Sequence, residues 1–175
     1  MSKIAISTTT LAALVLAACG GGAPPPPAGP PVERGIFISS GDCADSKKLS
    51  PEECDTAIEG AVAQHEAQAV VYKTVRACEA VAGPERCNKT GASQFRPRLQ
   101  AFFVVMAKPP TAVPLYAPKA SSMAFQSLSK QIVYAKDETI TVSASAITLA
   151  NENAKLPETS ADGAAGQAAA AADIH

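Results

Sequence analysis

The stretch Cys43-Ala-Asp-Ser-Lys-Lys-Leu-Ser-Pro-Glu-Glu-Cys54 carries the clearest structural signal in the chain, a helix start set between two cysteines. Ser50 is a favourable N-cap, and Pro51 suits the first helical position because the N–H that it lacks would have no partner there. Glu53 lies three residues after the cap and can complete a capping box. Apolar side chains then recur at helical spacing. The sequence therefore predicts a long helix from Pro51 to about Val71.

A second, shorter helix is predicted downstream. Thr74 can cap a segment that runs to Ala82, and Gly83-Pro84 is a stop signal directly after it. Cys78 lies inside this segment and Cys87 in the loop that follows. Each predicted helix therefore has a cysteine within it and another cysteine close by in the sequence.

The first residues have the features of an export signal. One lysine is followed by a short apolar stretch, Ile4–Leu16, and by small residues before Cys19. The stretch is too short for a membrane span, which needs about 20 apolar residues. Leu16-Ala-Ala-Cys19 resembles the bacterial lipobox, which implies cleavage before Cys19 and lipid on its thiol and new amino group. Three acyl chains are enough for stable anchoring in a membrane.

Residues 19–34 follow as a tether rich in glycine and proline. Its prolines favour an extended conformation, so we expect a spacer between the lipid and the folded part. A proline-rich ligand for a partner is the less favoured alternative. Gly20 resembles the outer-membrane sorting default of enteric bacteria, so we expect an outer-membrane protein that faces the periplasm.

Four cysteines remain besides Cys19, and an even number in a small exported domain indicates disulfides. A helix from Cys54 most of the way to Cys78 would hold them roughly 30 Å apart, too far for a bond unless the chain folds back sharply at Tyr72-Lys73-Thr74. Local pairing (Cys43–Cys54 with Cys78–Cys87) and crossed pairing (Cys43–Cys78 with Cys54–Cys87) stay open, and we favour the local one. A zinc site or a redox-active dithiol is disfavoured because no close cysteine pair is present.

Several short segments have strand character. The sequence predicts a first strand at Arg34–Ser40, a buried one at Leu99–Met106, and an edge strand at Val113–Tyr116 because of its proline. Gln131–Ala135 and Thr139–Ser143 resemble the arms of a hairpin. We therefore expect a small α+β domain, stapled by disulfides, in which one long and one short helix pack on a few antiparallel strands.

The domain boundaries follow from these segments and from composition. We expect a signal peptide at residues 1–18, the lipidated tether at 19–34, the α+β domain at 35–150 and a disordered, alanine-rich tail at 151–175. Only 5% of the residues are aromatic and tryptophan is absent, so a large core is not expected. The net charge of -1 and the lack of a basic cluster argue against nucleic acid as a partner.

No residue pattern indicates a catalytic or cofactor site. His65 lies on the apolar helix face without a second internal histidine, and Glu52 and Glu53 are explained by their place at a helix N-terminus. Arg96 and Arg98 flank the apolar run, where solubilising a strand end is favoured over contact with anionic lipid. We expect no catalytic residue, no cofactor and no metal.

The cysteine order also resembles a known family. Asp42-Cys43, Glu53-Cys54, Tyr72 and Thr74 before Cys78, Gly83 before Cys87, the apolar block at Leu99–Met106 and Pro114-Leu115-Tyr116 are similar to the YgiB-like bacterial proteins, a family of unknown function. The chain lacks the long Gly/Gln/Ser-rich inserts of some relatives. The resemblance implies an envelope lipoprotein with a cysteine-stapled domain, and no catalytic or ligand residue comes with it.

Two functions remain open on the sequence alone. The first is a membrane-anchored envelope lipoprotein that acts as a non-enzymatic binding or structural module, with an envelope protein or the cell wall as its partner. The second is an enzyme or small-ligand carrier with a pocket beside Phe102, Phe103 and Tyr116. An enzyme is the less favoured of the two.

Overall fold

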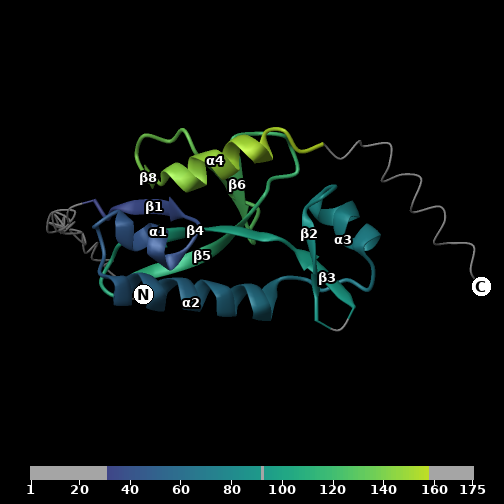
Figure 1. Ribbon diagram of the computed structural model, residues 1–175, viewed down its shortest axis with the longest axis horizontal. Coiled ribbons are helices and arrows are strands. Elements are labelled where there is room, and N and C mark those ends of the chain that lie inside the picture. The colour runs from purple at the N-terminus through teal and green to yellow at the C-terminus, as the bar shows by residue number, and fades with distance from the viewer. Residues whose placement is uncertain (1–30, 92, 158–175) are drawn as a thin grey trace, which may run out of the picture. The chain divides into compact units, whose positions relative to one another are not determined.

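The computed structural model describes residues 31–91 and 93–157. They form a mixed α+β domain with four helices, a curled six-stranded sheet and a separate two-stranded sheet (Figure 1). The elements in chain order are β1 (Arg34–Phe37), α1 (Ser40–Asp45), α2 (Pro51–Gln68), α3 (Val75–Ala82), β2 (Cys87–Thr90), β3 (Gln94–Pro97), β4 (Leu99–Val105), β5 (Thr111–Tyr116), β6 (Ala124–Ser127), β7 (Ile132–Tyr134), β8 (Thr141–Val142) and α4 (Ala144–Asn153). None of the described helices combines the length and the apolar character that crossing a membrane would need.

The capping box that the sequence predicts for α2 is present. The Ser50 hydroxyl accepts from the Glu53 N–H at 3.2 Å, and the Glu53 carboxylate accepts from the Ser50 N–H at 2.9 Å. The helix ends at Gln68, three residues before the expected Val71. The chain leaves the helix there because Tyr72 pairs with Phe95 of β3 in an isolated bridge.

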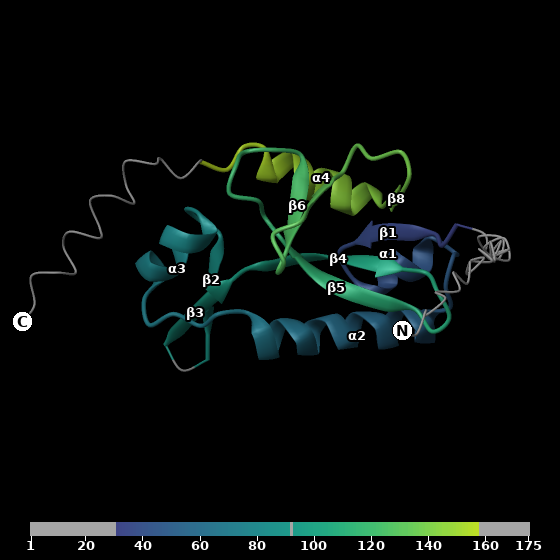
Figure 2. The same cartoon turned by 180° about the vertical axis from the view of Figure 1, so that it is seen from behind.

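The large sheet has the strand order β7-β6-β5-β4-β1-β8. Every neighbouring pair is antiparallel except β1 and β8, which run parallel. The α+β class is therefore confirmed, with one parallel pair added to the expected antiparallel strands. Helices α2 and α4 cover opposite faces of this sheet, as the views from the front and from behind agree (Figures 1 and 2).

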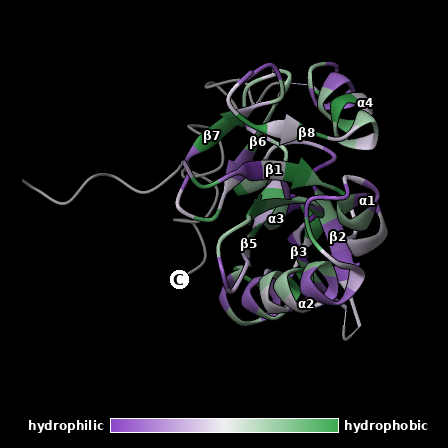
Figure 3. Cartoon of the chain, turned by 90° about the vertical axis from the view of Figure 1, so that its left-hand side faces the viewer, coloured by the Kyte–Doolittle hydropathy of each residue, from purple (hydrophilic) through white to green (hydrophobic). Residues whose placement is uncertain are grey.

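Two apolar clusters occupy the two faces. One gathers Phe37, Phe102 and Val104 against α1 and α2, and the other gathers Ile36 and Leu115 against α4. Neighbouring residues of a strand fall into different clusters because side chains alternate between the faces of a sheet. The view coloured by hydropathy shows apolar residues on the inner sides of the layers (Figure 3). Both clusters are filled largely by alanine and mid-sized side chains, in keeping with the small core that the composition indicates.

Two disulfides join neighbouring elements. Cys43 in α1 is bonded to Cys54 in the first turn of α2, and their Cα atoms lie 5.9 Å apart. Cys78 in α3 is bonded to Cys87 at the start of β2, with 6.2 Å between the Cα atoms. This is the local pairing that the sequence analysis favoured over the crossed one.

The hairpin expected at Gln131–Ala135 and Thr139–Ser143 is wrong. Strand β7 pairs with β6, and β8 pairs with β1 at the other edge of the sheet. The local turn forms one hairpin earlier, where Ser127 N–H donates to the Gln131 carbonyl at 2.9 Å. The partner of β8 is therefore β1, which is distant in the sequence, and not the neighbouring β7.

Strand β5 was expected at an edge because of Pro114, and it lies inside the sheet instead. It runs between β4 and β6. Strand β6 pairs only with Leu115 and Tyr116. Pro114 thus lies outside the β6 ladder, so an inner strand tolerates its missing N–H.

The strand expected at Arg34–Ser40 ends at Phe37, and helix α1 begins at Ser40. The Ser39 hydroxyl caps it by accepting from the Asp42 N–H at 3.1 Å. The Asp42 carboxylate accepts in turn from the Ile38 N–H at 2.9 Å. A cap of two residues and the disulfide at Cys43 therefore stabilise a helix too short to show a periodic pattern.

Helix α4 extends into the stretch that was expected to be a tail. It runs to Asn153, whose side chain is 1% exposed and donates to Gln100 Oε1 at 2.9 Å and to the Ala124 carbonyl at 3.1 Å. These two hydrogen bonds explain why residues beyond 150 are ordered despite little apolar surface. The remainder of the expected tail, from residue 158, and residues 1–30, including Cys19, lie outside the described residues.

Two glycines give a matched test of this packing. A Cβ at Gly35 would lie 2.7 Å from the Phe37 ring and 2.9 Å from the Thr141 carbonyl oxygen of β8, so Gly35→Ala must displace a core ring or a paired backbone. We expect the free energy of unfolding to fall by about 1–3 kcal/mol. Gly60 in α2 has open space around it, so Gly60→Ala should raise the free energy by about 0.5–1 kcal/mol. Urea unfolding measures both, and equal effects would contradict the close packing assigned around Gly35.

Candidate functional site

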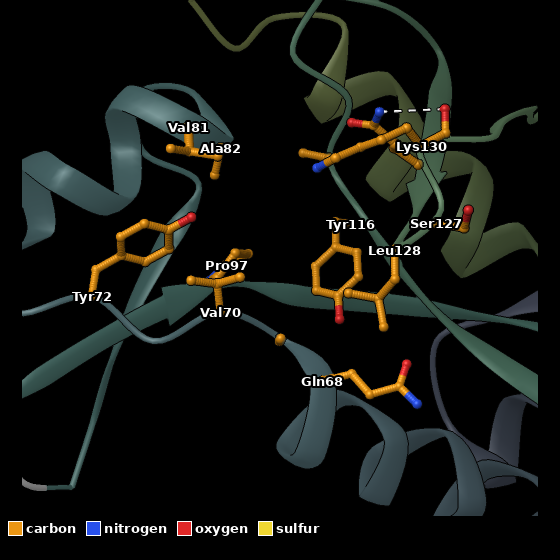
Figure 4. Close-up of a pocket in the computed structure, with 13 residues that line it drawn as sticks. Gln68, Val70, Tyr72, Val81, Ala82, Pro97, Tyr116, Ser127, Leu128 and Lys130 are labelled. Atoms are coloured by element: carbon orange, nitrogen blue, oxygen red, sulfur yellow. Dashed lines mark hydrogen bonds between the residues drawn. The ribbon is translucent and has the colours of Figure 1, made fainter. Parts of the chain in front are cut away.

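A pocket lies where the main sheet meets the small unit made of α3, β2 and β3. We call it the junction pocket, and its volume is about 350 Å³ (Figure 4). Its lining residues are Gln68, Ala69, Val70, Tyr72, Val81, Ala82, Pro97, Tyr116, Ala117, Gln126, Ser127, Leu128 and Lys130. The pocket thus draws on segments from residue 68 to residue 130, and it lies at the lower end of the size range of small-molecule sites.

Each wall comes from the end of an element. The C-terminus of α2 and the residues after it form one wall, and the last turn of α3 forms another. The ends of β3 and β5 form the floor, and the turn between β6 and β7 closes the remaining side. Element ends meet here because the chain enters the small unit after α2 and returns to the main sheet at β4.

Hydrogen bonds join the small unit to the segments around it. Tyr72 and Phe95 exchange two backbone hydrogen bonds, each of 2.8 Å. The guanidinium of Arg86, which is 2% exposed, donates to the Pro157 carbonyl at 2.8 Å and to the Lys119 carbonyl at 3.3 Å. The small unit is thereby joined to the segment after α2 and to the segments around Lys119 and Pro157.

Gly83, directly after the α3 wall, adopts a conformation that other residues avoid. Its φ angle is +104°, and an added Cβ would lie 2.5 Å from Arg86 Nη1. The glycine therefore ends α3 and leaves room for the buried guanidinium. Besides ending the helix as the sequence predicts, Gly83 thus allows Arg86 to pack closely against it.

The lining of the junction pocket is mostly apolar. Val70 and Val81 at its rim are 60% and 41% exposed, although they are large apolar side chains. Among the residues that line it are no carboxylate, no cysteine and no histidine, and Lys130 carries the one formal charge. Such a lining suits the binding of an apolar group better than proton or group transfer.

A hydrogen-bonded pair lies behind the wall that Tyr116 forms. His65 Nδ1 and the Tyr116 hydroxyl are 2.8 Å apart, and their rings are tilted by 40°. Burial raises the pKa of Tyr116 to about 12, against a smaller lowering effect of the nearby charge of Arg96. Burial also lowers the pKa of His65, as does Arg96, while Glu66 acts in the opposite direction. Both side chains are therefore neutral at neutral pH.

The three aromatic residues expected to share a pocket do not meet. Phe102 is 6% exposed in the cluster under α2, and Phe103 packs on the opposite face of the sheet. There Phe103 lines a second cavity, of about 460 Å³. Of these three residues, only Tyr116 lines the junction pocket. Alternation along β4 separates the two phenylalanines, so adjacency in the sequence was misleading.

The remaining candidate residues do not line the junction pocket. Glu53 caps α2 as predicted. Arg96 and Arg98 are half-buried, not exposed at a strand end, and the Nε atom of each is buried without a hydrogen-bond partner. Within residues 31–91 and 93–157, no group of three or more His, Cys, Asp or Glu side chains is placed to hold a metal ion.

Sequence reasoning missed most of the pocket. Val70, Val81, Leu128 and Lys130 were not singled out, since none belongs to a motif. One available signal was the apolar run that continues past the C-terminus of α2, at Ala69–Tyr72. An apolar run after the last helical residue indicates surface that another part of the chain, or a ligand, covers.

Comparison with known proteins gives one match. A family model described as "Protein of unknown function (DUF1190)" matches residues 31–173. No curated protein and no solved structure matches the chain. The matched range contains both disulfides and every residue that lines the junction pocket.

The His65–Tyr116 pair makes a prediction about pH. Because the folded state lowers the pKa of His65 below its ordinary value of 6.5, the unfolded chain binds more protons as the pH falls through this value. The contribution of His65 to stability is therefore complete above pH 6.5 and declines below it. Urea unfolding at pH 5.5 and 7.5 should show a smaller pH dependence for His65→Gln than for the wild type. Equal dependence in the two proteins would contradict the assigned burial of His65.

Proposed function

This chain belongs to the DUF1190 family of proteins of unknown function, and we propose that it is a lipid-anchored binding protein of the bacterial envelope. In this proposal Cys19 carries the lipid, and the α+β domain holds a ligand in the junction pocket without transforming it. The finer resemblance to the YgiB-like envelope lipoproteins is part of the same proposal.

The junction pocket is the observation that carries the proposal. It is concave, mostly apolar and rimmed by exposed valines that a soluble domain would otherwise bury. Its one charged lining residue is Lys130, and its hydroxyl groups include the strongly held Tyr116. A pocket of this kind gains free energy by covering apolar surface of a ligand.

The compartment is supported by the cysteines. Disulfides persist in oxidising compartments such as the bacterial periplasm, and the four cysteines of the domain are paired. Cys19 is left over, at the end of a Leu-Ala-Ala-Cys lipobox and before a proline-rich spacer. An outer-membrane anchor facing the periplasm, with an envelope protein or the cell wall within reach, agrees with both observations.

Between a carrier of small ligands and an enzyme, the geometry favours the carrier. General acid–base catalysis works best with a pKa near the operating pH. Tyr116 has a pKa of about 12, and its hydroxyl is engaged by His65, which does not line the pocket. The pocket volume of about 350 Å³ is nevertheless large enough for a small molecule.

Two matched positions test the proposal. A photo-crosslinking amino acid at Val70, on the pocket rim, should form an adduct in intact envelopes. The same group at Ile147, an exposed apolar residue of α4 that lines none of the cavities described above, should not. Equal adducts at both positions, or none at Val70, would contradict a binding role for the pocket.

The same strains test the anchor. Labelling with a fatty-acid analogue should mark the wild-type protein and leave Cys19→Ala unmarked. A wild-type protein that takes up no label would remove the lipid from the proposal while leaving the pocket unaffected.

A further inference from the structure

From the charge distribution around the junction pocket we infer its ligand class: a single acyl-type chain that ends in one anionic group, with this group beside Lys130. The inference rests on the proposed binding function and adds the chemistry of the ligand.

The ionic charge of the lining is positive only. Among its 13 residues Lys130 is the one ionic side chain, and none is acidic. Outside the lining, the positive charge of Arg96 acts on Tyr116, while on His65 it is opposed by the negative charge of Glu66. A ligand with a negative group is therefore favoured at this site, and a cationic one is repelled.

Lys130 is held where it can meet such a group. It lies in the tight turn between β6 and β7, with a φ angle of +67° and its N–H donating to the Ser127 carbonyl at 3.0 Å. Its carbonyl accepts from Gln126 Nε2 at 3.5 Å, and its side chain extends from the turn toward the α3 wall (Figure 4). In the described part of the chain the one ion pair is Lys48–Glu33, so Lys130 has no acidic partner there.

The apolar part of the ligand follows from the other walls. Val70, Val81, Pro97 and Leu128 line the pocket without ionisable groups. Burial of methylene groups against such walls is the main source of affinity, because an exposed ion pair contributes little. A volume of about 350 Å³ favours one chain of medium length over a phospholipid with two chains.

Three probes of equal chain length separate these terms. Decanoate, decanol and decylammonium are tested against the full-length protein by displacement of an apolar fluorescent dye. Decanoate should bind most tightly and decylammonium least. Lys130→Gln should weaken decanoate binding by about two- to fivefold, the worth of an exposed ion pair, and leave decanol binding unchanged.

Two further variants provide the controls. Lys136→Gln removes the same charge from an exposed lysine that lines none of the cavities described above, and it should leave all three affinities unchanged. Leu128→Glu places a carboxylate in the pocket wall, and a bound ligand would have to desolvate it. This variant should lower decanoate affinity by more than about tenfold. Circular dichroism checks that each variant is folded.

The outcomes are distinguishable. Decanoate binding that is tighter than decanol binding, and a difference that Lys130→Gln removes, would support the inference. Equal affinities for the three probes would overturn the ligand class while leaving the binding function in place. Tighter binding of an apolar peptide with a free C-terminal carboxylate would replace the amphiphile by a peptide. No binding of any probe would overturn both the inference and the pocket as a binding site.

Discussion

The Cys78–Cys87 disulfide is the constraint on which the architecture around the pocket depends. Among the described residues from 72 to 98, Cys78 is the one apolar side chain that is fully buried. The unit made of α3, β2 and β3 therefore has almost no core of its own. Small units of this kind need a covalent staple, and a bond that closes a loop of about ten residues contributes about 3 kcal/mol. The bond between α3 and β2 supplies what side-chain packing does not.

The other disulfide has a different environment. Cys43 and Cys54 belong to the cluster of Phe37, Phe102 and Val104, so this bond reinforces a core that already exists. The main sheet, which has an apolar cluster on each face, is thus stabilised by side-chain packing. The Tyr72–Phe95 bridge joins the small unit to the segment after α2, and Arg86 joins it to the segment after α4. The pocket lies at this attachment, where one wall is held by packing and another by a covalent bond.

Features that are decided by neighbouring residues could be predicted from the sequence, and features that depend on distant residues could not. The capping box of α2, the cap of α3 at Thr74 and its stop at Gly83 are decided within a few residues, and each was predicted. The parallel β1–β8 pair and the inner place of β5 depend on residues about 100 positions away or on strand order, and both were missed. The pocket was missed for the same reason, since its walls come from α2, α3, β3, β5 and the β6–β7 turn. Tyr116 was singled out together with Phe102 and Phe103, and of these three only Tyr116 lines the pocket.

Amide hydrogen exchange on a protein without the Cys78–Cys87 bond tests the central claim most directly. In a Cys78→Ser/Cys87→Ser variant the account predicts that the amides of α3 lose protection, while those of α2, β4 and β5 keep it. The Cys43→Ser/Cys54→Ser variant should instead lower protection throughout the main sheet, since its cysteines lie in that core. Unchanged protection of α3 in the first variant would contradict the account, because the wall of the pocket would then be held by packing and not by the covalent bond.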